Sequence, residues 1–115
     1  MKKCACIVVN YNNASDVINL VNIIIGYKIF ETIIIVDNCS TDDSVIQLSK
    51  ISASEIQLVK TEKNGGYGAG NNYGVKIAKD SGCEIAVIAN PDVVFSKECM
   101  LHILETFSRY PDCAI

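Results

Sequence analysis

Four short runs with the composition of β-strands alternate along this chain with segments that have the composition of helices. The runs are CACIVV (4–9), TIIIVD (32–37), EIQLVK (55–60) and EIAVIA (84–89). Three of them are almost continuously apolar, which is typical of parallel strands that helices cover on both faces. The run at 55–60 is more amphipathic, as expected of a strand at a sheet edge. The alternation predicts an α/β fold with three layers around a mainly parallel sheet.

A helix is expected after each run, at 15–25, from about 40 onward, at about 69–81 and at about 97–109. Ser15 is suited to cap the first helix and Gly26 to end it. The acids and hydroxyls of STDDS favour the start of the second helix. The last helix should place His102 on its polar side. Its expected core residues are Met100, Leu101, Ile103, Leu104 and Phe107.

The composition limits the classes of protein to which the chain can belong. Its 115 residues are half hydrophobic and 20% charged, which suits the core of one domain. A net charge of -3 without any basic run argues against a nucleic-acid partner. No apolar stretch approaches the ~18 residues of a membrane-spanning helix, and the apolar part of MKKCACIVVNYNN is too short for a signal peptide. We therefore expect a cytoplasmic chain with no transmembrane segment.

Six cysteines raise the question of a metal site or a set of disulfides. They contain no C-x-x-C pair, and His102 has no partner at the spacing of metal ligands. Cys4 and Cys6 lie in an apolar run, where free cysteine behaves as a small hydrophobe. We interpret the cysteines as free thiols, as is usual in a reducing compartment.

Polar loops follow all four predicted strands. They are Asn10–Asn13, Asp37–Ser40, Lys63–Gly68 and Asn90–Asp92. Right-handed crossovers place the carboxyl ends of parallel strands along one edge, where ligands bind near the point at which the strand order reverses. Each loop alone could be a simple turn, but four polar loops at one edge form a candidate cleft.

The glycine-rich loop after the third strand excludes several nucleotide-binding motifs. It lacks the order G-x-G-x-x-G and any Gly-Lys-Ser/Thr, and a haloacid-dehalogenase-like enzyme would need a carboxylate where Cys39 stands. Gly70, Gly74 and Ala78 recur every four residues and favour close packing of the helix on the sheet. Three further glycines precede the helix, where the backbone can approach a ligand closely. They are Gly65, Gly66 and Gly68.

Four motifs together resemble the nucleotide-sugar-binding N-terminal half of a family 2 glycosyltransferase with the GT-A fold, of rhamnosyltransferase-like type. The motifs are VVNYNN, IIIVDNCSTDDS, KNGGYGAGNNYGVKIA and VIANPDVVF. The resemblance extends from Cys4 to about Phe107. It implies transfer of a sugar, with inversion, from a dTDP- or UDP-sugar to a saccharide or lipid-linked acceptor in cell-surface polysaccharide synthesis. The full-length protein would then act in the cytoplasm at the inner face of the membrane.

The resemblance also implies a set of nucleotide-sugar-binding residues. They are Asn10, Tyr11, Asn12, Asp37, Asn64, Gly65, Gly66, Asn72, Asn90 and Asp92. Tyr11 would pack against the base, and Asp37 would accept hydrogen bonds from the base or ribose. Asp92 corresponds to the second acid of the D-x-D motif and would hold Mg²⁺ or Mn²⁺ at the donor diphosphate. Two positions depart from the pattern, because Asn90 replaces the first acid and Asn71 stands where relatives often have arginine.

In this family the catalytic base and the acceptor-binding half lie downstream of the D-x-D strand, so we expect the base beyond Ile115. Residues 1–115 would be the donor-binding part of a transferase domain, inactive alone and able to form a homodimer through an exposed sheet edge. Two other interpretations stay open. One is a non-catalytic nucleotide-binding or regulatory α/β module, and the other is a purely structural domain.

Overall fold

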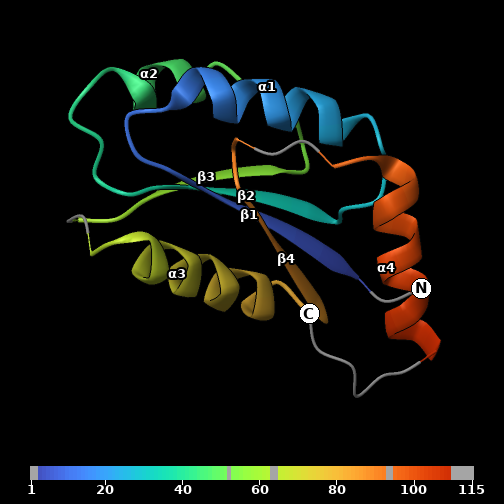
Figure 1. The fold of residues 1–115 in the computed structure, drawn as a ribbon. Helices are drawn as coiled ribbons and strands as arrows, with labels where there is room; N and C mark the ends of the chain where they lie inside the picture. The colour runs from blue at the N-terminus through green and yellow to red at the C-terminus, as the bar shows by residue number, and fades with distance from the viewer. Residues whose placement is uncertain (1–2, 52, 63–64, 93–94, 110–115) are drawn as a thin grey trace.

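The computed structural model describes residues 3–51, 53–62, 65–92 and 95–109 as a parallel sheet between layers of helices (Figure 1). The strands are β1 (Cys4–Asn10), β2 (Thr32–Asp37), β3 (Ile56–Lys60) and β4 (Ile85–Ala89). The helices are α1 (Ala14–Ile25), α2 (Ser44–Leu48), α3 (Tyr67–Asp80) and α4 (Lys97–Arg109). The predicted strands and the fold class are confirmed, with strand ends that shift by one residue.

All three strand pairings in the sheet are parallel, and the strand order is β3-β2-β1-β4. Ile7 in the central strand β1 pairs with Ile34 of β2 on one side and Ile88 of β4 on the other. The order runs outward from β1 through β2 to β3, and then reverses to place β4 on the opposite side of β1. The reversal therefore lies between β1 and β4.

The two faces of the sheet bury alternate residues of the same strands, as the period of a strand requires. Cys6, Val8 and Ile35 belong to the core on the side of α1, and Met100 of α4 joins them. Residues of opposite parity form the core on the side of α3. That second core contains Ala5, Ile7, Val9, Ile34, Val36 and Ala78. Figure 1 shows α3 alone on one face, with α1 and α2 on the other.

Helix α3 packs on the sheet through its glycines. A methyl group at Gly74 would lie 2.5 Å from Cγ2 of Ile7, and one at Gly70 would lie 3.0 Å from Cγ1 of Val9. Both distances are shorter than ordinary carbon–carbon contact, so only glycine allows this approach. The predicted packing role of Gly70 and Gly74 agrees with this geometry. Gly66, which precedes the helix, has a φ of 91°, a conformation that favours glycine.

The start of α1 differs from the prediction. The helix begins at Ala14 after Asn13, and no side chain caps it, so Ser15 lies within the first turn. The backbone carbonyl of Asn13 accepts the amide of Val17, and the amide of Asn13 donates to Oδ1 of Asn10. The buried Asn10 side chain thereby fixes where the chain enters the helix.

Two large apolar residues of the predicted elements are exposed, and one of them, Leu101, was expected in the core. Leu101 is 39% exposed, since Met100 and Leu104 form the buried face of α4 and Leu101 lies about 100° around the helix from Met100. Ile88 is 48% exposed because β4 is an edge strand whose α3-side face extends beyond that helix. The side chain of Phe107 lies outside the described residues.

The sequence also raised questions about the cysteines, about a metal site and about membrane-spanning helices. Cys4, Cys6, Cys39, Cys83 and Cys99 are free thiols. Within the described ranges, no three His, Cys, Asp or Glu residues come together as they would around a metal ion. The helices in that part of the chain are also too short or too polar to cross a membrane.

Candidate nucleotide-sugar site

Strands β1 and β2 end in a buried hydrogen-bond network. Asn10 and Asp37 are register partners with 0% and 1% exposure, and Asn10 Nδ2 donates to Asp37 Oδ1 over 2.9 Å. Ser40 completes the network, because its hydroxyl donates to Asp37 Oδ1 over 2.6 Å and its amide to Oδ2 over 3.1 Å. The Asp37 carboxylate thus accepts three hydrogen bonds from the protein. A direct contact with a base or ribose would have to share or displace one of them.

Asn12 joins the loop after β1 to the loop after β2. Its Oδ1 accepts the amides of Thr41 (2.8 Å) and Asp42 (3.2 Å), and its Nδ2 donates to Oγ1 of Thr41 over 3.0 Å. Its own amide donates to Oγ of Ser40 over 3.0 Å. The residue has a φ of 52°, in the left-handed region that asparagine tolerates better than most residues. Hydrogen bonds from Asn12 therefore join the loop after β1 to residues 40–42 of the loop after β2.

Asn38 joins the second loop to the third. Its Nδ2 donates to the carbonyl oxygen of Gly66 over 2.9 Å, and its Oδ1 accepts the hydroxyl of Thr61 over 3.0 Å. Asn38 is 3% exposed, and its side chain lies beside Gly70, where α3 packs closely on the sheet. The glycine-rich loop is thus held next to the ends of β1 and β2.

These loops border a cavity of about 360 Å³ at the carboxyl edge of the sheet, where the strand order reverses between β1 and β4. Tyr11 presents a ring that is 45% exposed. Polar groups of Asn38, Asn90 and Asp92 lie around the same space. The full lining is Val9, Tyr11, Asn13, Asn38, Gly66, Asn90, Pro91 and Asp92.

The structure brings four of the predicted binding residues together around this cavity. They are Tyr11, Gly66, Asn90 and Asp92. Five others do not line it: Asn10 and Asp37 are buried, Asn12 and Gly65 are exposed loop residues, and Asn72 is an exposed residue of α3. Asn64 lies outside the described residues. Nucleotide contact by each of the ten stays a prediction.

Asn38 and Asn13 line the cavity although the sequence analysis did not select them. Asn38 directly follows Asp37 at the end of β2. A signal was present, since the first residue after a buried strand points toward the edge where ligands bind. Asn13 gave no such signal because its place depends on where α1 begins.

Asp92 provides the carboxylate among the residues that line this cavity, and the oxygen of Asn90 accepts the amide of Asp92 over 3.3 Å. One carboxylate and one amide oxygen are too few to enclose an ion. They do fit Mg²⁺ or Mn²⁺ that takes its other ligands from water and substrate phosphates. The donor set therefore suits a cation bound together with a diphosphate, in spite of Asn90 at the first D-x-D position.

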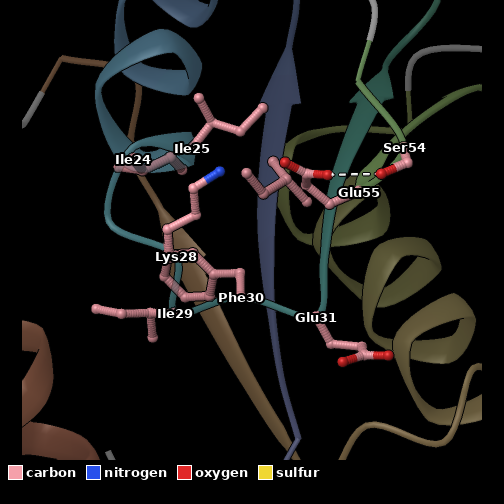
Figure 2. A pocket seen from close by; sticks show the side chains of 9 residues that line it. Ile24, Ile25, Lys28, Ile29, Phe30, Glu31, Ser54 and Glu55 are labelled. Carbon is pink, nitrogen blue, oxygen red and sulfur yellow. Dashed lines mark hydrogen bonds between the residues drawn. The ribbon is translucent and has the colours of Figure 1, made fainter.

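A second cavity, of about 330 Å³, lies at the opposite end of the sheet (Figure 2). Isoleucines and Phe30 form its floor, and Lys28 extends across it toward Ser54 and Glu55. A hydrogen bond from the Ser54 hydroxyl, and to a smaller extent the nearby Lys28, lowers the pKa of Glu55. This cavity has neither the strand-end amides nor the glycine loop of the first one. The carboxyl edge is the better candidate for a nucleotide site.

Comparison with known proteins identifies the family and the fold of the chain. Residues 5–115 match the family described as glycosyl transferase family 2. The low-salt glycan biosynthesis hexosyltransferase Agl10 of Haloferax volcanii is 32% identical over 93 residues, which are 80% of this chain and 28% of that protein.

Among solved structures, the mannosyltransferase PcManGT from Pyrobaculum calidifontis, in complex with GDP-Man and Mn²⁺, superposes with a TM-score of 0.82 at 18% identity. The superposition covers 93% of this chain and 32% of that one, so the chain spans about a third of either relative or less. The shared architecture is the GT-A fold. By its nearly full-length match, the chain belongs to glycosyl transferase family 2.

Proposed function

We propose that this chain binds the nucleotide diphosphate part of a sugar donor at the carboxyl edge of its sheet, as the donor-binding part of a glycosyltransferase. The observation that carries the proposal is the cavity between the ends of β1 and β4. It combines an exposed aromatic ring (Tyr11), amide groups (Asn38, Asn90) and one carboxylate (Asp92) at the point of strand reversal.

Each of these groups has a distinct task in the proposal. The Tyr11 ring packs against the base, and Asn38 fixes the position of the glycine loop beside it. Asp92 and the Asn90 oxygen hold the divalent cation at the phosphates. A cation bound there would neutralise the negative charge that develops on the departing diphosphate.

The reaction we propose is an inverting displacement, in which an acceptor hydroxyl attacks the anomeric carbon and the nucleotide diphosphate leaves. A base must take the proton of that hydroxyl. Asp92 is committed to the cation, and the Asp37 carboxylate is buried under three hydrogen bonds. We therefore propose that the 115-residue chain binds the donor but transfers no sugar. The acceptor is a saccharide or lipid-linked saccharide of a cell-surface polysaccharide, and transfer takes place on the cytoplasmic side.

For the base we propose a pyrimidine, supplied as UDP or dTDP, because Tyr11 and Asp37 stand at the ends of adjacent strands and the four motifs together resemble rhamnosyltransferase-like members of the family. GDP is the necessary comparison, since the mannosyltransferase of similar fold was solved with GDP-Man. The three nucleotides carry the same diphosphate and differ in the base and in the ribose 2′-hydroxyl, which dTDP lacks. A difference between UDP and GDP reports on the base contact. The comparison of UDP with dTDP reports on the 2′-hydroxyl together with the 5-methyl group of thymine.

Isothermal calorimetry with UDP, dTDP and GDP in Mn²⁺ tests the proposal. Tyr11→Ala should weaken binding of the preferred nucleotide at least about 5-fold, since aromatic stacking on a base contributes about 1–3 kcal/mol. Tyr73→Ala is the matched control, because Tyr73 is 44% exposed on α3 and does not line the cavity. Equal loss in both variants, or no binding of any nucleotide by the wild type, would contradict the proposal.

A further inference from the structure

Asn12 has few hydrogen-bonding groups left for a ligand. A side-chain amide offers two N–H groups and two acceptor positions on its oxygen. The oxygen of Asn12 accepts two backbone amides, from Thr41 and Asp42, and one N–H donates to Oγ1 of Thr41. Three of the four positions are therefore used within the protein. Asn12 is also absent from the lining of the cavity, whereas its neighbour Tyr11 is part of it.

Tyr11 is held from both sides of the chain. On one side Asn10 is buried and bonded to Asp37, Ser40 and the amide of Asn13. On the other side Asn12 turns the backbone with a φ of 52° and is bonded to the 40–42 loop. A half-exposed tyrosine between two fixed neighbours has its Cα–Cβ direction set by them.

We propose that Asn12 is a positioning residue: by bonding the 40–42 loop it fixes the backbone at which Tyr11 presents its ring to the cavity. The consequence for nucleotide affinity rests on the proposed function, whereas the consequence for the loop and the ring does not. The competing assignment is direct contact between Asn12 and the nucleotide. It predicts the same loss of affinity with no change in the position of the Tyr11 ring.

Asn12→Gly is the test variant, because glycine accepts the positive φ and removes all three side-chain hydrogen bonds. Lys28→Gly is its matched control. Lys28 has a φ of 58° and lies at the opposite end of the sheet, so the exchange carries the same backbone effect without touching the loops. Asn12→Asp is the rescue variant, since a carboxylate can accept the two amides and also the hydroxyl of Thr41.

Two measurements need no ligand. Amide hydrogen exchange by NMR should be at least about 5-fold faster at Thr41 and Asp42 in Asn12→Gly, as expected for the loss of a typical hydrogen bond. The ring resonances of Tyr11 in a tyrosine-labelled sample should shift in Asn12→Gly and stay unchanged in Lys28→Gly. Asn12→Asp should return both the exchange rates and the ring resonances to the wild-type values.

The third measurement is the affinity for the nucleotide diphosphate preferred by the wild type, among UDP, dTDP and GDP. It should fall about 5- to 10-fold in Asn12→Gly and stay the same in Lys28→Gly. Lower affinity with unchanged Tyr11 resonances would overturn the proposal in favour of direct contact. Unchanged exchange at Thr41 and Asp42 would also overturn it, because Asn12 would then not hold the loop. If the wild type binds no nucleotide, the proposed function fails while the exchange and ring measurements still decide the role of Asn12.

Discussion

The close packing of α3 on the sheet can be tested by alanine substitution at three glycines of this helix, which have different amounts of space around them. A methyl group at Gly68 would meet nothing within 4 Å, one at Gly70 would lie 3.0 Å from Val9, and one at Gly74 would lie 2.5 Å from Ile7. Replacing each glycine with alanine changes the helix propensity in the same direction, by up to about 1 kcal/mol in favour of alanine. The differences among the three variants therefore report on packing.

Gly74→Ala should be the most damaging of the three. Cγ2 of Ile7 belongs to a stiff β-branched side chain with 0% exposure in the central strand, so it has little freedom to move away. Overpacking of this kind costs about 1–3 kcal/mol. After the gain in helix propensity we expect a net loss of roughly 0–2 kcal/mol, against a gain of up to about 1 kcal/mol for Gly68→Ala. Gly70→Ala should fall between them.

Urea unfolding followed by far-ultraviolet circular dichroism measures these differences in a chain that has no tryptophan. The order of stability should be Gly68→Ala, then Gly70→Ala, then Gly74→Ala. Gly74→Ala should also weaken nucleotide binding, because a displaced α3 would pull the Gly66 carbonyl away from Asn38. Equal stability of Gly68→Ala and Gly74→Ala would refute the packing argument.

Three further predictions concern the acids and the thiols. Asp37→Ala should lower the free energy of unfolding by about 2 kcal/mol and abolish nucleotide binding, because it removes the acceptor of three hydrogen bonds at the loop junction; unchanged urea unfolding would show that the network contributes nothing. Asp92→Asn should leave metal-free nucleotide affinity intact and remove its enhancement by Mg²⁺ or Mn²⁺, and an enhancement that persists in calorimetry would place the cation elsewhere. Burial, with a smaller effect from the nearby Cys83, raises the pKa of Cys4 to about 12, so about one thiol in ten thousand is ionised at pH 8. Ellman's reagent at pH 8 should therefore label the exposed Cys39 and Cys99 quickly and Cys4 only as the protein unfolds; rapid labelling of Cys4 would show that β1 is accessible.

Much of the fold could be predicted because it depends on local composition. An apolar, β-branched run such as 32–37 is stable only in a strand that is covered on both faces. The spacing of Gly70 and Gly74 likewise indicates that their helix packs closely on the sheet. The burial of apolar residues at the edge of the sheet and at the sides of helices could not be predicted in the same way. Whether Ile88 or Leu101 is covered depends on how far neighbouring elements extend, and the sequence does not encode that locally.

The candidate site shows the same division. The four loops and their location were predictable from the positions of strand ends, and Tyr11, Asn90 and Asp92 do line one cavity. The tasks of Asn10 and Asn12 were not predictable, because the partners that tie them to the loop after β2 lie 27 to 30 residues away in the chain. Polar residues that bind a ligand and polar residues that hold two loops together look alike until their partners are known.

Nucleotide binding is proposed at the carboxyl edge of the sheet, in the cavity of about 360 Å³, and not in the cavity of about 330 Å³ at the amino edge. Titration of the ¹⁵N-labelled chain with UDP, dTDP and GDP in the presence of Mg²⁺ distinguishes the two sites. We expect the amide resonances of Tyr11, Asn38 and Asp92 to shift with added nucleotide while those of Lys28 and Glu55 stay in place. Shifts confined to Lys28, Glu55 and their neighbours, or none at all, would contradict it.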